Sequence, residues 1–231
     1  MRLKYKKGRR LCYISHLDTL RTFIRACRRA KLPLAYSQGF NPHPLISFLM
    51  PLSLGFTSEC EYVDIGLEEE IFAGEVIARL NAALPDGFLV ISGGAPHDKP
   101  GDITSAVYKI IFSGKLVEDA ARPAGGTECF IDGIKRFFAQ REIVAPKKSK
   151  RGVKEVDIRP MILDWEMDGP LSEAGAAPEN GGLALKLRLA AGSIENLNPT
   201  LVLTQLEGFL GEELTYHVCR EKIFCGDREF A

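Results

Sequence analysis

The sequence predicts an α+β protein made of two ferredoxin-like sandwiches in tandem, each with the element order β-α-β-β-α-β. Three observations carry this prediction. Strand-like alternation and helical periodicity follow one another in that order over residues 1–93, a Gly/Pro/Asp-rich stretch comes next at 94–105, and the same order returns over 106–231. We therefore expect an N-terminal domain at 1–93, a linker at 94–105 and a C-terminal domain at 106–231, within the usual size range of small domains.

The first half begins with a strand at 1–7, where apolar and charged residues alternate. Ser15 and Asp18 have the spacing of a capping box, which predicts the start of a helix, and Pro33 requires that helix to end before it. The apolar row of this helix is expected at Leu17, Leu20, Ile24 and Cys27. The next strand is expected in two pieces, 34–38 and 45–52, which the turn-rich segment GFNPHP separates. The remaining elements of this half are expected as strands at 61–68 and 88–92 and an amphipathic helix at 70–84.

The second half repeats this order without residue-level identity to the first. A helix is expected to open at Asn198 and Pro199, because an asparagine cap followed by proline suits the first helical turn. The other expected elements are a strand at 106–114, a helix at 127–140 and strands at 153–167, 182–191 and 214–225.

The composition excludes several classes of protein. No apolar run reaches the roughly 18–20 residues that a membrane span needs, and the basic start lacks the apolar stretch of a signal peptide. The six cysteines include no C-x-x-C pair, which favours reduced thiols. His16 and Asp18 are two residues apart on a helix and point in different directions, so we expect no metal site from them and His43. The expectation is a cytoplasmic protein without membrane segment, metal or cofactor.

The formal net charge of zero conceals a strong asymmetry. Residues 1–58 contain eleven Lys and Arg residues and one acidic residue, Asp18. Because the whole chain has 30 basic and 30 acidic residues, the rest of it contains 19 basic and 29 acidic ones. A positively charged segment of this size attracts polyanions, unless the acidic remainder of the chain folds against it.

The arginines of the first predicted helix form a stripe. Arg21, Arg25 and Arg28 are spaced i, i+4, i+7 and share a face, which Arg29 and Lys31 widen. Guanidinium groups suit phosphate oxygens because each offers several N–H donors in a planar fork. The stripe therefore predicts binding to the phosphates of RNA; the alternative is a solvated face, or one paired with acidic residues of the second half.

A second basic run lies in the C-terminal half, on what we expect to be a hairpin-like excursion before a strand. Its residues are Lys147, Lys148, Lys150, Arg151 and Lys154. Flexible lysines of this kind commonly bind a polyanion through charge alone. They are equally common as residues that only keep a surface solvated.

The segment SQGFNPHP predicts a rigid turn, because it combines glycine, two prolines and asparagine. Its candidate residues are Tyr36, Ser37, Gly39, Phe40, Asn41, Pro42, His43 and Pro44. Tyr36 and Phe40 offer aromatic faces on which a base stacks, a contact of about 1–3 kcal/mol each. The interpretation preferred from the sequence is instead that Phe40 fills the core beneath the turn.

The string ISHLDTLRTFIRACRRAKLPLAYSQGFNPHPLISFLMPLSLG resembles the signature of the bacterial radical SAM-linked protein family, whose activity is unassigned, and VKEVDIRP is also similar to the family pattern. The resemblance implies an accessory role in RNA or ribosome modification, beside or fused to a radical SAM enzyme of the cobalamin-binding type. The chain contains no C-x-x-x-C-x-x-C motif, so a partner would have to supply any iron–sulfur cluster.

A weaker resemblance is to the CRISPR repeat-processing endoribonucleases, which also pair two ferredoxin-like units. It implies that His16, near the start of the first helix, transfers a proton without a metal, with Tyr13 close to it in sequence. The glycine-rich C-terminal loop of that group is missing, since the chain ends EKIFCGDREFA.

The leading hypothesis is therefore a non-catalytic partner domain that binds tRNA or rRNA for a separate radical SAM enzyme. One alternative is a metal-independent endoribonuclease that uses His16. The other is a protein-docking module whose basic helix meets an acidic surface of the radical SAM partner.

Overall fold

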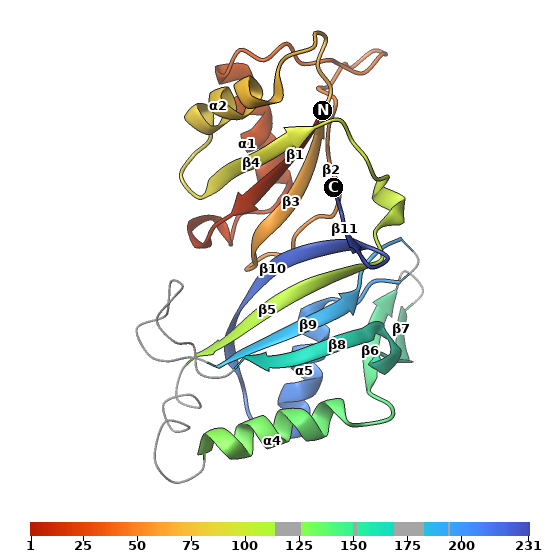
Figure 1. Cartoon of the computed structure of the whole chain (residues 1–231). Coiled ribbons are helices and arrows are strands. Elements are labelled where there is room, and N and C mark those ends of the chain that lie inside the picture. Colours follow the sequence, from red (N-terminus) through yellow and green to blue (C-terminus); the bar gives the residue numbers. More distant parts are fainter. Residues whose placement is uncertain (114–125, 150–151, 169–182, 194) are drawn as a thin grey trace. The chain divides into compact units, whose positions relative to one another are not determined.

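The computed structural model describes residues 1–113, 126–149, 152–168, 183–193 and 195–231 (Figure 1). Over these residues the protein is a mixed α/β structure with mostly antiparallel strands and four α-helices. The chain divides into two compact units. Unit 1 consists of Met1–Asp102 together with Cys219–Ala231, and unit 2 consists of Ile103–Val218.

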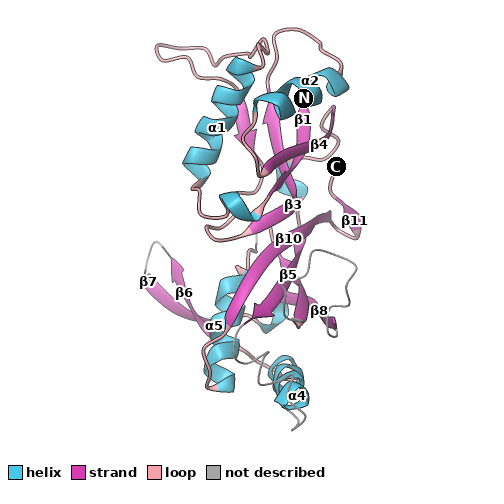
Figure 2. Ribbon diagram, turned by 90° about the vertical axis from the view of Figure 1, so that its left-hand side faces the viewer, coloured by secondary structure: helices cyan, strands magenta, loops and turns pink. Residues whose placement is uncertain are grey.

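Unit 1 is a sheet with two helices on one face (Figure 2). Its elements in chain order are β1 (Arg2–Lys7), α1 (His16–Arg29), β2 (Ile46–Phe48), β3 (Thr57–Ile65), α2 (Ala73–Ala83), β4 (Phe88–Gly94), the end of β10 (Thr215–Cys225) and β11 (Arg228–Glu229). Strand β1 lies between β3 and β4 and is antiparallel to both. Strand β2 pairs with one end of β3, and β10 pairs with its other end in parallel at Cys219 and Arg220.

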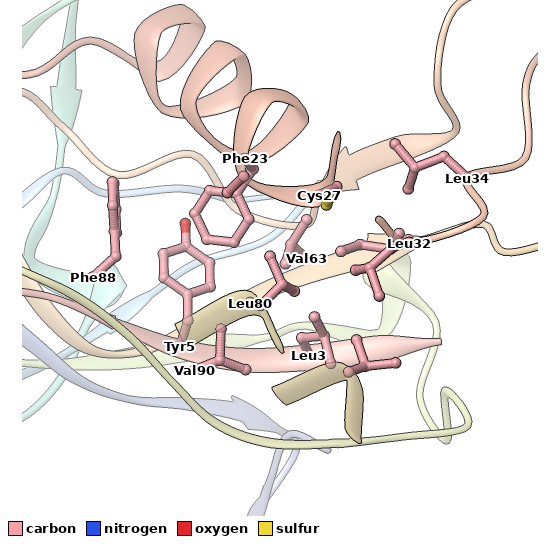
Figure 3. Packing of buried hydrophobic residues seen from close by; sticks show 13 residues of the cluster. Leu3, Tyr5, Phe23, Cys27, Leu32, Leu34, Val63, Leu80, Phe88 and Val90 are labelled. Atoms are coloured by element: carbon pink, nitrogen blue, oxygen red, sulfur yellow. The ribbon is translucent and has the colours of Figure 1, made fainter. Parts of the chain in front are cut away.

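The core of unit 1 lies between this sheet and its helices (Figure 3). Leu3 and Tyr5 alternate along β1, so both point to the same face and meet Phe23 of α1 and Leu80 of α2. The Tyr5 and Phe23 rings are 4.9 Å apart between centroids, and Phe88 packs edge-on against both. A single cluster of side chains therefore fixes both helices on the sheet.

Helix α1 begins where the capping box predicts. The Asp18 backbone N–H donates to Ser15 Oγ at 3.1 Å, and Ser15 Oγ donates to Asp18 Oδ2 at 2.7 Å. Its buried face agrees with the expected apolar row only in part. The buried residues are Thr19, Phe23, Ala26 and Cys27. Of the expected row, Cys27 is buried, Leu20 and Ile24 are half-buried, and Leu17 is 59% exposed, because the large Phe23 ring occupies the core instead.

Unit 2 also combines antiparallel strands with helices. Its elements are β5 (Ser105–Ser113), α4 (Gly126–Phe138), β6 (Val144–Ser149), β7 (Gly152–Asp157), β8 (Ile162–Asp168), β9 (Ala184–Ala190), α5 (Pro199–Leu210) and the start of β10. Strand β9 is antiparallel to both β5 and β8. Strands β6 and β7 form a hairpin of their own (Figure 2). Asn198 caps α5 as predicted, accepting from the Thr200 N–H at 2.9 Å.

Two expected strands differ in the structure. The single strand expected at 153–167 is broken into β7 and β8 by a 3₁₀ turn at Arg159–Met161, because Pro160 lacks an N–H and Asp157 Oδ1 accepts the Arg159 N–H instead. The strand expected at 34–38 is reduced to isolated bridges from Leu34 and Tyr36.

The division into units also differs from the expected boundaries. Residues 219–231 belong to unit 1, because Tyr62 Oη donates to the Phe230 carbonyl at 2.6 Å and Lys4 pairs with Glu229 at 3.0 Å. The expected linker at 94–105 is largely part of unit 1 as well. Its Asp98 is buried and accepts hydrogen bonds from Arg228 and from the Ala231 N–H. Because these contacts join residues far apart in the sequence, no local sequence pattern predicts them.

Candidate nucleic-acid interface

The four cations of β1 have partners within unit 1, whereas in the turn after it Arg9 is exposed and Arg10 forms only a highly exposed ion pair. The ion pairs are Arg2 with Asp64, Lys4 with Glu229, Lys6 with Glu59 and Arg10 with Asp86. Lys7 is buried, and its Nζ donates to the Ile14 carbonyl at 3.2 Å. A hollow of about 400 Å³ lined by Arg2 and Lys4 therefore offers no unpaired cation. Much of the N-terminal positive charge is thus used inside the unit.

The outer face of α1 carries three further arginines. Arg21, Arg25 and Arg28 are all exposed on the side opposite Phe23, and we call these three residues the arginine ridge. Arg21 forms a 3.1 Å ion pair with Asp18, in which both side chains are more than half exposed. Among the described residues, no acidic side chain forms an ion pair with Arg25 or Arg28. The ridge is therefore a cationic surface with one weak, exposed partner.

The arginine ridge affects the pKa of Asp18. Its hydrogen bond with Ser15 lowers the pKa of the Asp18 carboxyl, and Arg21 and Arg25 lower that pKa further. Asp18 therefore stays ionised and serves mainly as the helix cap.

Arg29 lies apart from the ridge. Its Nη2 donates to the Ala83 carbonyl at 2.5 Å, at the C-terminal end of α2. A cation suits this position because the last carbonyls of a helix have no intrahelical partner. Arg29 thus joins the two helices of unit 1.

Lys31 adds a charge at the end of α1 in an unusual backbone conformation. Its φ is 52°, and it is the one non-glycine residue with positive φ among those the structure describes. The Lys31 N–H donates to the Arg28 carbonyl at 3.1 Å, and the Leu32 N–H to the Cys27 carbonyl at 3.0 Å. This is the Schellman pattern, in which glycine is usual at the position that Lys31 holds.

The second basic run lies on the β6–β7 hairpin of unit 2. Lys147 and Lys154 are directly opposite each other, a like-charge pair that disfavours the hairpin slightly. Lys147 Nζ donates to the Asn196 carbonyl at 3.0 Å, and Lys154 is exposed. Lys148 belongs to β6, but its side chain, like Lys150 and Arg151, lies outside what the structure describes.

The SQGFNPHP turn is rigid at its base and open at its tip. Ser37 Oγ lies 2.8 Å from His43 Nδ1 and accepts the His43 N–H at 3.1 Å, while Tyr36 and Pro44 form an isolated bridge. Phe40 at the tip is fully exposed, with a relative exposure of 111%. The expectation that Phe40 fills the core is therefore wrong, because the hydrogen bonds at the base of the turn leave its tip outside the core of unit 1.

Gly39 at this tip has a φ of 131°, a backbone conformation that residues other than glycine rarely adopt. Asn41 and Pro42 are exposed beside it. Tyr36, at the base, is 39% exposed. Of the two aromatic residues of the turn, Phe40 is thus the more exposed one.

His16 and Tyr13 lie at the N-terminal end of α1. His16 is exposed, and its ring packs edge-on against Phe48 at 5.5 Å between centroids. Beside it is a cavity of about 10 Å³, room for about one water, that Lys7 and Glu61 also line. Burial lowers the pKa of the Lys7 ammonium. Tyr13 is 81% exposed.

Sequence reasoning missed the exposure of apolar residues around Tyr13. Leu17 was assigned to the core, yet it is exposed in line with the ridge, and Leu54 is exposed as well. One sequence feature indicated that Leu17 is exposed: it lies one helical turn before Arg21 and therefore on the same face of the helix.

The cysteines and acidic residues offer no metal site within the described ranges, where no group of three or more His, Cys, Asp or Glu side chains converges. Burial raises the pKa of the Cys27 thiol to about 11 and that of Cys60 to about 12. These two thiols are therefore packing groups. None of the described helices is both long and apolar enough to cross a membrane.

The chain was compared with known proteins. No curated protein matches it. A crystal structure of an unknown protein from Galdieria sulphuraria is similar over 94% of this chain and 96% of that chain, at 12% identity and a TM-score of 0.26. A family model described as "Uncharacterized protein conserved in bacteria (DUF2344)" matches residues 1–199. With most of its length matched by this model, the chain belongs to that family.

Proposed function

We propose that this protein is an accessory RNA-binding protein that uses the arginine ridge to hold phosphates of tRNA or rRNA. The observation that carries the proposal is a contrast between two sets of cations. Those of β1 have partners inside unit 1, whereas Arg25 and Arg28 form no ion pair with any described acidic side chain. An exposed guanidinium with free N–H donors suits the phosphate backbone.

The backbone conformation of Lys31 supports the proposal of phosphate binding on α1. An L-residue in the left-handed region costs roughly 1–2 kcal/mol relative to ordinary helical geometry. Glycine would relieve that strain at this position, as it does at Gly211 after α5. Lys31 therefore adopts this conformation at a cost in backbone energy, and its exposed ammonium adds positive charge near Arg28, the last arginine of the ridge.

The β6–β7 hairpin is a second candidate contact. Its directly opposed Lys147 and Lys154 concentrate positive charge on one face of a two-stranded ribbon. We propose that Lys148, Lys150 and Arg151 add to this charge. The hairpin would then strengthen binding through charge alone, without reading sequence.

The proposal extends to the setting of the protein. From the resemblance of residues 14–55 to the radical SAM-linked family, we propose that it acts in the cytoplasm with a separate radical SAM enzyme that modifies RNA or ribosomes. We also propose that each half is a ferredoxin-like sandwich. The element order β1-α1-β2-β3-α2-β4 and the antiparallel pairing of β1 with β3 and β4 support this for the first half.

The test is a titration with bulk tRNA at several salt concentrations. The wild type is expected to bind with nanomolar-to-micromolar affinity and a steep negative salt slope. The double variant Arg25→Ala, Arg28→Ala should reduce that slope by about 1.4–1.8 and weaken binding at least about tenfold at 50 mM salt.

A charge-matched control keeps this test specific. Arg79→Ala with Arg136→Ala removes two exposed arginines outside the ridge and should leave binding near the wild-type value. Equal weakening by both double variants would contradict a site on α1. No binding by the wild type would end the proposal, and co-purification of the radical SAM partner without RNA affinity would select the docking module.

A second candidate function is metal-independent RNA cleavage with His16 as the proton-transfer group and Tyr13 near it. The observation that favours it is the cavity that exposed His16 shares with Lys7 and Glu61. Labelled RNA incubated with the protein in EDTA should be cleaved, and His16→Ala should abolish the cleavage. Intact RNA with the wild type would remove this candidate.

A further inference from the structure

Three large apolar side chains stand exposed near the N-terminal end of the arginine ridge. Tyr13 is 81% exposed, Leu17 59% and Leu54 62%. The Tyr13 ring comes within 3.9 Å of the position that a Cβ atom on Gly55 would occupy, so it lies against the turn that carries Leu54. Single exposed apolar residues are ordinary, whereas grouped ones mark contact surfaces. We call these three residues the Tyr13 patch.

Leu17 connects the patch to the ridge along one face of α1. Successive helical residues turn by about 100°, which places Leu17, Arg21, Arg25 and Arg28 within an arc of about 80°. This arc is opposite the buried face that contains Phe23 and Ala26. A ligand lying along α1 would therefore meet apolar surface first and guanidinium groups next.

Tyr13 is held on a fixed backbone. The residue before it, Cys12, is buried, and its carbonyl accepts the Gly55 N–H at 2.8 Å. The residue after it, Ile14, accepts a hydrogen bond at its carbonyl from the buried ammonium of Lys7 at 3.2 Å. Because both neighbours are anchored, little backbone freedom is lost at Tyr13 when a ligand stacks on its ring.

We propose that the Tyr13 patch and the arginine ridge together bind an unpaired nucleotide in a single-stranded segment of RNA, with the base stacked on Tyr13 and adjacent phosphates on Arg21 and Arg25. This inference rests on the proposed function and specifies the form of RNA. A base has an apolar face attached to a charged backbone, which matches an aromatic ring followed by guanidinium groups. Bases inside a duplex are stacked on one another and offer no free face.

The experiment compares a 12-nucleotide oligouridine with a 12-base-pair RNA duplex, both labelled with fluorescein, by fluorescence anisotropy. Loss of one base–aromatic stack corresponds to about 1–3 kcal/mol. Tyr13→Ala should therefore weaken oligouridine binding by about 5–150-fold. Duplex affinity and the salt slope should stay unchanged, and Tyr13→Phe should bind like the wild type. Phe72→Ala removes a largely exposed aromatic residue at the start of α2 and serves as the matched control.

The outcomes separate this inference from the function it rests on. If the wild type binds neither RNA, the proposed function fails. If the wild type binds oligouridine and Tyr13→Ala binds it equally well, the stacking site is overturned while the proposed function stands. Equal weakening of oligouridine and duplex, or loss of binding by Tyr13→Phe, also overturns the stacking site. Thermal unfolding of each variant identifies any that fails to fold, in which case Leu17→Ala replaces it with a smaller expected loss.

Discussion

Arg220 and Glu61 form a buried, bidentate ion pair between residues 159 positions apart in the chain. Arg220 Nε donates to Glu61 Oε1 at 2.8 Å and Nη2 to Oε2 at 2.6 Å, and the side chains are only 2% and 5% exposed. Nη2 also donates to the Met50 carbonyl at 2.7 Å, and Ser58 Oγ donates to the Arg220 carbonyl at 3.0 Å. The pair thus fastens the C-terminal part of β10 to β3 in unit 1.

Glu61→Ala should lower the free energy of unfolding by about 3–5 kcal/mol, because it leaves the Arg220 guanidinium buried without its counter-charge. Urea denaturation followed by circular dichroism measures the change. The matched control is Glu59→Ala on the same strand, which removes a half-exposed ion pair with Lys6 and should change stability by about 1 kcal/mol or less. Similar losses in the two variants would contradict a special role for the buried pair.

Phe40→Ala should leave the free energy of unfolding within about 0.5 kcal/mol of the wild type, because the ring is fully exposed and has no core contacts to lose. Phe23→Ala, which empties the centre of the core in Figure 3, should reduce it by about 3–5 kcal/mol. The same urea titrations compare the two. A loss above about 2 kcal/mol in Phe40→Ala would restore the idea that this ring supports the turn from within the core.

The elements that sequence reasoning found are those with local causes. The Ser15 cap of α1 and the Asn198 cap of α5 depend on residues two or three positions away, so the pattern alone predicts them. The buried face of α1 was predicted only in part because two apolar stripes compete at helical spacing. Leu17 belongs to the longer apolar one, but Phe23 has the larger ring and fills the core.

The candidate site was predicted in part for a related reason. The sequence counts charges but does not show which of them find partners. Arg2 and Lys4 looked as open as Arg25, yet both are paired through residues far along the chain, Asp64 and Glu229. Only the folded arrangement reveals that Arg2 and Lys4 have partners, whereas Arg25 and Arg28 form no ion pair with a described acidic side chain.

Stability should fall as the pH rises above about 8.5, the ordinary pKa of a cysteine thiol. Burial raises the pKa of Cys60 to about 12, so the folded state keeps this proton over a range in which the unfolded chain releases it. The contribution is complete below the ordinary pKa and is lost as the pH rises toward 12. Urea denaturation between pH 8 and 10.5 should therefore show a decline that Cys60→Ala makes shallower.

Cys129→Ala serves as the control for this pH dependence, because Cys129 is exposed and its removal should leave the slope unchanged. Alkylation gives an independent check: iodoacetamide at pH 8 should modify Cys129 in the native protein and reach Cys60 only after unfolding. An unchanged pH slope in Cys60→Ala would show that other groups cause the decline.

Lys31→Gly should raise the free energy of unfolding by about 0.5–1 kcal/mol. Relief of the left-handed strain, roughly 1–2 kcal/mol, exceeds the entropy that glycine adds to the unfolded chain. Lys31→Ala separates backbone from charge, since alanine keeps the strain and loses the ammonium; its stability should stay within about 0.5 kcal/mol of the wild type. If the charge serves RNA binding, both variants should lower the tRNA salt slope by about 0.7–0.9. Equal stability of the glycine and alanine variants would mean that the φ of 52° carries no strain. The backbone conformation of Lys31 would then no longer support a role for its charge in RNA binding.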